Sequence, residues 1–235
     1  MAKEKDFSDM TIKERLQNEK KKLKELSFKK KIEYIWDYYK PIMVGIILTI
    51  TLVSVIIQMA INISKEDVLY IATINSVTQM EENFPFVEGF KEYAAIDERK
   101  QVVTVDTSLM LNYESEDMDE YYMSAVMKLA AIIAARQLDV MLMEESVYNR
   151  HLYDGTFYDL HELLPEELYK RVEPYLIWGI TEEESTSRPY AIDVTDIAEV
   201  DVANTFGDKE ILLGVITNTK NQEYVIQFIE YLFNE

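Results

Sequence analysis

The chain has 235 residues, no cysteine, and 43 acidic against 24 basic side chains, which gives a formal net charge of −19. The lack of cysteine excludes disulfide bonds, thiolate metal sites, a cysteine nucleophile and a lipoprotein-type acyl anchor. Residues 1–40 hold 12 Lys and Arg against 8 Asp and Glu (net +4), whereas residues 65–235 hold 12 against 35 (net −23). A region this acidic is not expected to bind nucleic acid or an anionic membrane surface.

Residues 1–40 are predicted to form a basic head that ends in an amphipathic helix over 28–39. Its apolar side chains recur at helical spacing beside three lysines. They are Phe28, Ile32, Ile35, Trp36 and Tyr39, next to Lys29, Lys30 and Lys31. Before a membrane span, this pattern predicts a helix at the membrane interface with its lysines on anionic lipid. Packing of the helix on a cytoplasmic partner protein is the alternative.

Residues 41–64 contain no charged side chain and are predicted to form a transmembrane helix. Such a helix is about 36 Å long, which spans a hydrocarbon core of about 30 Å with some tilt. Pro41 is expected to open it, at a position where the missing N–H costs nothing. A buried core helix rarely runs this long without a charge, and the long charged region before it favours a signal anchor over a cleaved signal peptide.

The lysines before the span predict a single-pass protein of the cell membrane, with a cytoplasmic N-terminus and an extracytoplasmic C-terminal region. That region, residues 65–235, is predicted to be one α/β domain with a mostly parallel sheet and helices on both faces. Runs rich in Val, Ile and Tyr predict strands over 67–75, 101–106, 139–143, 190–194 and 211–217. Apolar residues at helical spacing predict helices over 84–95, 117–137, 146–153 and 221–233, and another that Pro165 opens and Pro174 ends or kinks.

Residues 128–165 resemble the extracellular solute-binding proteins of bacterial ABC importers. In that family a helix of the type kl-aaiaaG precedes a strand DV, a second helix and a segment G-l-dL--ll. The matching residues here are Lys128, Leu129, Ala130, Ala131, Asp139, Val140, Gly155, Asp159, Leu160, Leu163, Leu164 and Pro165, whereas Arg136 and Gln137 stand where the family often has Gly. Residues 188–193 look like the strand that leaves the first lobe, and residues 213–233 look like the returning strand and its helix.

The resemblance implies a single lobe of a periplasmic binding protein, because only residues 195–210 stand where the family inserts its second lobe. A clamp that buries a solute between two lobes is therefore not expected. We expect a membrane-anchored, non-catalytic binding or docking module that serves an importer or another membrane or envelope assembly. The alternative is a tethered receptor that binds a small solute at the strand ends.

No catalytic, metal or cofactor site is predicted, and the chain is not expected to be an enzyme. The segment His161-Glu162-Leu163-Leu164-Pro165 lacks the second His of the H-E-x-x-H zinc motif, and no Gly-rich phosphate loop or G-x-S-x-G occurs. In open α/β sheets, ligands bind outside the carboxyl ends of strands. This rule gives a candidate ligand or partner rim at Asp106, Thr107, Glu144, Glu145 and Ser146; the alternative is that they are ordinary loop and helix-cap residues.

Overall fold

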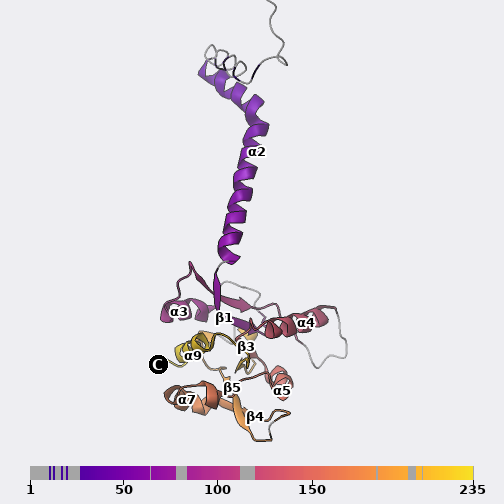
Figure 1. Ribbon diagram of the computed structural model, residues 1–235, viewed down its shortest axis with the longest axis vertical. Helices are drawn as coiled ribbons and strands as arrows, with labels where there is room; N and C mark the ends of the chain where they lie inside the picture. The colour runs from indigo at the N-terminus through magenta and orange to yellow at the C-terminus, as the bar shows by residue number, and fades with distance from the viewer. Residues whose placement is uncertain are drawn as a thin grey trace, which may run out of the picture. The chain divides into compact units, whose positions relative to one another are not determined.

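The computed structural model describes residues 27–63, 65–77, 84–111, 120–183, 185–200, 205–207 and 209–234, together with positions 11, 13, 17 and 20. The chain divides into two compact units, residues 1–63 and residues 64–235. In the described residues, the first unit contains a long helix, and the second contains a six-stranded sheet with its helices (Figure 1). Most of the predicted basic head lies outside the described residues.

The long helix α2 runs from Phe28 to Ile63, so the predicted amphipathic helix and the predicted span form one element. Pro41 therefore lies inside a helix, and the prediction that it opens the span is wrong. A proline in a helix interior removes one backbone hydrogen bond and favours a kink. The ribbon of α2 bends in its N-terminal third (Figure 1).

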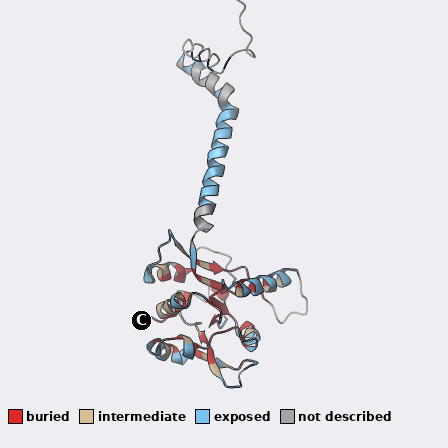
Figure 2. Ribbon diagram, in the orientation of Figure 1, coloured by how far each residue is buried: buried red, intermediate tan, exposed pale blue. Residues whose placement is uncertain are grey.

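Within α2, the window Ile42–Met59 has a mean hydropathy of 2.5 and is long and apolar enough to cross a membrane. All of its side chains are exposed in this unit (Figure 2). The hydroxyls of Thr49 and Thr51 donate hydrogen bonds of 2.8 and 2.9 Å to the carbonyls of Gly45 and Ile47. These two polar groups are thus satisfied within the helix, as a lipid environment requires.

The second unit is built on a mixed sheet with the strand order β2-β1-β3-β6-β5-β4. β1 pairs in parallel with β2 and β3, whereas the β3–β6, β6–β5 and β5–β4 pairs are antiparallel. The strands are β1 (Glu66–Thr73), β2 (Gln101–Asp106), β3 (Val140–Met143), β4 (Leu176–Gly179), β5 (Arg188–Asp193) and β6 (Leu212–Val215). The α/β class is confirmed, but the sheet is mixed rather than mostly parallel. One reason is that a short loop joins β4 to β5, and short loops join antiparallel strands.

Helices cover both faces of the sheet. One face carries α3, α6, α7 and α9, and the other carries α4 and α5 (Figure 1). Their bounds are α3 (Pro85–Tyr93), α4 (Glu120–Ala134), α5 (Glu145–Tyr153), α6 (Leu160–Leu163), α7 (Glu166–Val172) and α9 (Gln222–Leu232), with 3-10 turns η2 (Glu173–Tyr175) and η3 (Ala198–Val200).

The central strands supply two separate cores, one on each face of the sheet. Val140 and Leu142 of β3 belong to the core beneath α3, α7 and α9, whereas Met141 and Met143 belong to the core beneath α4 and α5. This alternation follows from the two-residue period of a strand. Both faces of β3 are apolar because helices cover both.

Candidate functional site

The carboxyl ends of the three parallel strands meet at one edge of the sheet, called here the carboxyl edge. β1 lies between β2 and β3, so the predicted rim residues at the end of β2 and after β3 flank its end. Asp106 and Thr107 are buried and Glu144 is partly buried, whereas Glu145 and Ser146 are exposed in the first turn of α5. The fold therefore brings all five predicted rim residues to the same edge.

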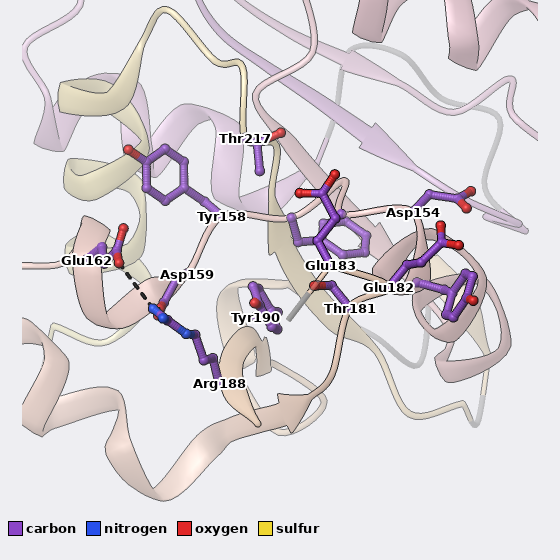
Figure 3. A pocket seen from close by; sticks show the side chains of 13 residues that line it. Asp154, Tyr158, Asp159, Glu162, Thr181, Glu182, Glu183, Arg188, Tyr190 and Thr217 are labelled. Atoms are coloured by element: carbon purple, nitrogen blue, oxygen red, sulfur yellow. Dashed lines mark hydrogen bonds and ion pairs between the residues drawn. The ribbon is translucent and has the colours of Figure 1, made fainter. Parts of the chain in front are cut away.

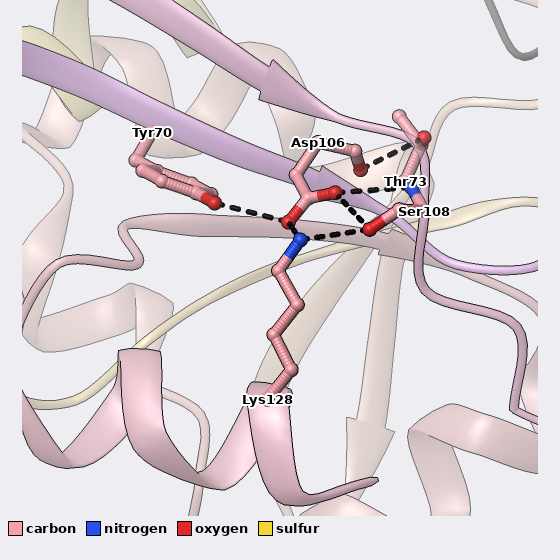
Figure 4. A network of polar contacts seen from close by, with 5 residues as sticks. All are labelled: Tyr70, Thr73, Asp106, Ser108 and Lys128. Carbon is pink, nitrogen blue, oxygen red and sulfur yellow. Dashed lines mark hydrogen bonds and ion pairs between the residues drawn. The ribbon is translucent and has the colours of Figure 1, made fainter. Parts of the chain in front are cut away.

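Asp106 is the most densely bonded of these residues (Figure 4). Its Oδ2 lies 2.6 Å from Lys128 Nζ of α4 and accepts a 3.0 Å hydrogen bond from the Tyr70 hydroxyl. Its Oδ1 accepts hydrogen bonds from the backbone N–H and the hydroxyl of Ser108, at 3.0 and 2.7 Å. Lys128 also donates to the Ser108 hydroxyl at 2.7 Å. Both carboxylate oxygens of Asp106 are thus occupied by groups of the protein.

The electrostatics of Asp106 follow from this network. Burial by itself raises the pKa of the carboxyl, because it penalises the charged form. The hydrogen bonds from Lys128, Ser108 and Tyr70 favour the charged form and outweigh burial, so the net effect lowers the pKa of Asp106 below its usual value. Asp106 is therefore a stable carboxylate held by an internal cation.

Glu144 is likewise paired within the protein. Its Oε1 lies 2.8 Å from Lys209 Nζ and accepts a 3.4 Å hydrogen bond from Asn75 Nδ2. Asn75 follows β1 in a left-handed conformation, with φ of 58°. Its amide also bonds both backbone groups of Leu111, at 2.6 and 2.8 Å. Asn75 thereby ties together the chain segments that follow all three parallel strands.

The end of β1 is also covered by a distant part of the chain. Thr205 is buried, and its carbonyl accepts hydrogen bonds from the Ser76 hydroxyl at 3.1 Å and from the Val77 N–H at 2.9 Å. Ser76 is itself buried. Together with the pairs at Asp106 and Glu144, these contacts make the carboxyl edge a surface whose polar groups largely bond one another.

A hollow of about 430 Å³ lies at the opposite edge, where β5 begins and β6 ends (Figure 3). It is called here the amino-edge hollow. Its lining is rich in carboxylates and tyrosines: Tyr153, Asp154, Gly155, Phe157, Tyr158, Asp159, Glu162, Thr181, Glu182, Glu183, Arg188, Tyr190 and Thr217. Its size falls within the range of small-ligand pockets, about 300–1,000 Å³.

Among the described residues that line this hollow, Arg188 is the basic one, and it is paired within the protein. Its Nη1 lies 2.7 Å from Asp159 Oδ2 and 3.1 Å from Glu162 Oε1. The other oxygen of Asp159 accepts a 2.9 Å hydrogen bond from the His161 N–H and so caps α6. Among the described residues, no ion pair engages Asp154, Glu182 or Glu183, so the hollow is strongly negative.

The amino-edge hollow was not predicted from the sequence. The rule that places ligands at the carboxyl ends of strands points to the other edge of the sheet. Arg188 meets Asp159 and Glu162 only because β5 and α6 pack together, and no local motif signals this pairing. Within the described part of the chain, no group of three or more His, Asp or Glu side chains is arranged to hold a metal ion.

The predicted membrane-interface residues lie on the first turns of α2. Lys29, Lys30 and Trp36 are exposed, and Lys40 Nζ lies 5.9 Å from the centroid of the Trp36 ring. This distance is that of a weak cation–π contact. The remaining predicted residues have a helical backbone, but their side chains lie outside the described ones: Phe28, Lys31, Ile32, Ile35 and Tyr39.

No protein-family model, curated protein or solved structure matches the chain.

Proposed function

We propose that the chain is a single-pass protein of the cell membrane whose extracytoplasmic α/β unit is a non-catalytic docking module. The apolar window Ile42–Met59 of α2 supports the anchor by length and composition. The charge difference between +4 before the span and −23 after it supports a cytoplasmic N-terminus. Anionic lipid at the cytoplasmic face is the expected partner of the lysines at the start of α2.

The α/β unit is proposed to resemble one lobe of a solute-binding protein that works without a second lobe. The strands that correspond to the departing and returning strands, β5 and β6, lie side by side as an antiparallel pair. Only residues 194–211 connect them, and the described part of this connection contains the short turn η3. Such a connection leaves no room for another domain that would close over a ligand.

The internal pairing at the carboxyl edge is the observation that carries the docking proposal. Asp106 and Glu144 are the carboxylates expected to face a ligand, and each is already bound by a lysine of the same chain. A solute binding there would have to displace these pairs and leave the buried carboxylate of Asp106 without its cation, which costs about 1–3 kcal/mol. A protein partner need not displace these ion pairs, because it gains affinity from a broad surface of roughly 800 Å².

A thermal-shift screen tests this proposal on the full chain in a neutral detergent. Sugars, amino acids and dipeptides at about 1 mM should leave the melting temperature unchanged, because a single open lobe binds small solutes at millimolar affinity or worse. A shift of several degrees by one solute at micromolar concentration would replace the docking module by the alternative, a tethered solute receptor. Loss of that shift in Glu144→Gln would then place the solute at the carboxyl edge, and its persistence would place it elsewhere.

A further inference from the structure

The outer edge of β4 is a free strand edge in the described part of the unit. β4 is the last strand of the sheet and pairs with β5 on one side. Residues 176–180 carry no charge, and Trp178 and Ile180 are 55% and 53% exposed. A strand edge presents a row of backbone N–H and C=O groups that can pair with another chain.

β4 has only four residues, and shortness is one protection of a free strand edge, but the other usual protections are absent from it. Proteins guard free edges with Lys, Pro or a bulge in the edge strand, and Leu176–Gly179 contains neither residue. The β4–β5 register does shift, but Ile177 pairs with Ala191 and Trp178 with Pro189, so the extra residue is Tyr190 of β5. β4 itself remains a regular strand, open to pairing.

The end of β4 leads directly into the amino-edge hollow. The loop after Ile180 carries Glu182 and Glu183, which line the hollow together with Asp154 (Figure 3). These three carboxylates are exposed and have no ion pair among the described residues. The chain thus passes from an uncharged strand edge into a loop that lines a negatively charged hollow.

The β4 edge could pair with a second copy of this chain or with a segment of another protein, and charge distinguishes these two occupants. A second copy of the chain would bring its own carboxylates and its own net charge of −23 in residues 65–235, so the two copies would repel. An extended segment with basic residues would meet complementary charge instead. The amino-edge hollow has room for a lysine or arginine side chain.

We propose that the β4 edge docks an extended, basic segment of a partner protein by β-strand addition. Backbone hydrogen bonds to β4 hold the segment, alternate apolar side chains contact Trp178 and Ile180, and a basic side chain enters the amino-edge hollow. The inference rests on the proposed docking function and names the surface and the partner chemistry.

The test measures binding of labelled peptides to the full chain in neutral detergent by fluorescence anisotropy. The probe is Lys-Lys-Thr-Val-Thr-Val-Thr-Lys-Lys. One control replaces all lysines by Glu, and the other replaces both valines by Pro, which removes backbone donors but keeps the charge. The lysine peptide should bind saturably and slow amide hydrogen exchange of residues 176–180, and both controls should bind at least about fivefold more weakly.

Matched variants locate the contact. Glu183→Lys should weaken binding of the lysine peptide about fivefold or more, because it reverses charge in the hollow. Glu92→Lys makes the same change on an exposed residue of α3 and should leave binding unchanged. Trp178→Thr keeps strand propensity but removes the apolar contact, and it should weaken binding while the circular dichroism spectrum is preserved.

Several results would overturn the proposal: no binding, equal binding of the acidic peptide, or unchanged exchange at β4. A concentration-dependent dimer with β4 protected in the absence of peptide would identify a second copy as the occupant. None of these results changes the outcome of the thermal-shift screen of solutes. Failure of this inference is therefore distinguishable from failure of the proposed docking function.

Discussion

At the scale of residues, the buried carboxylate of Asp106 connects several elements at the carboxyl edge. It joins β2 to α4 through Lys128, to β1 through Tyr70 and to its own following turn through Ser108. Because the net effect of these contacts is a lowered pKa, the carboxyl stabilises the folded state above its unfolded pKa of about 3.9. That contribution is lost as the pH falls through the lowered pKa.

Asp106→Asn should therefore reduce the free energy of unfolding at pH 7 by about 1–3 kcal/mol, since it leaves Lys128 without a charged partner. The difference from the wild type should begin to shrink as the pH falls below about 4, where the carboxyl of the unfolded chain takes up a proton, and should be lost below the lowered pKa of the folded state. Denaturant titrations at several pH values would measure both effects. Glu145→Gln, at an exposed position, is the control, and a difference that stays constant down to acid pH would show that Asp106 is not ionised in the folded protein.

The chain has two histidines, of which His151 is partly buried and His161 is exposed. Burial lowers the pKa of His151 most strongly; Asp154 raises it and Arg150 lowers it. Because the unfolded chain then binds a proton more readily, stability should fall as the pH drops below about 6.5 and level off below the lowered pKa. His151→Gln should remove most of this fall in melting temperature, whereas His161→Gln, at an exposed residue, should retain it. The reverse pattern would refute the assignment.

At the scale of elements, close packing of β6 on the segment after α5 depends on Gly214. A Cβ at this position would lie 2.6 Å from Phe157 Cδ1 and 2.8 Å from Met143 Cε. Gly214→Ala should therefore destabilise the α/β unit by about 1–3 kcal/mol through overpacking. Gly45→Ala in α2 is the matched control, because a Cβ there meets no atom within 4 Å. Equal denaturation midpoints for the two variants would show that the strand can shift at low cost.

The start of α2 gives a second prediction at this scale. A peptide of residues 24–40 should become helical on anionic vesicles, with Lys29, Lys30 and Lys31 contributing about 1 kcal/mol each at low salt. Its affinity should fall as the salt concentration rises, because the attraction is screened. Replacing the three lysines by Gln should abolish the preference for anionic vesicles. Equal binding of the original peptide to neutral vesicles would indicate that the lysines serve another partner.

The whole molecule is predicted to have one orientation across the membrane. Protease added to intact protoplasts should digest residues 65–235 and leave a small fragment that contains the head and α2, because the basic flank stays in the cytoplasm. Immunoblotting with tags at each terminus would follow the two parts. Survival of the C-terminal tag and loss of the N-terminal tag would reverse the orientation, and protection of both tags would contradict exposure of the α/β unit.

Local pattern was sufficient for most elements of the fold. The predicted strands over 67–75, 101–106 and 139–143 overlap β1, β2 and β3, because runs of Val, Ile and Leu identify buried strands without tertiary information. The helix opened by Pro85 and the helix over 221–233 were located for the same reason, through apolar residues at helical spacing. The carboxyl-edge residues were also brought together, since parallel strands share one edge.

The sequence by itself determined the charge division, the uncharged apolar segment and the alternation of helices and strands, because each is a property of neighbouring residues. Only the tertiary structure decided how distant segments combine. In the structure, α2 continues through Pro41 and β6 lies antiparallel beside β3. The edge strand β4 was not predicted from the sequence. The tertiary structure also joined Arg188 to Asp159 and Asp106 to Lys128. These pairings depend on the packing of elements far apart in the chain, and no local spacing encodes them.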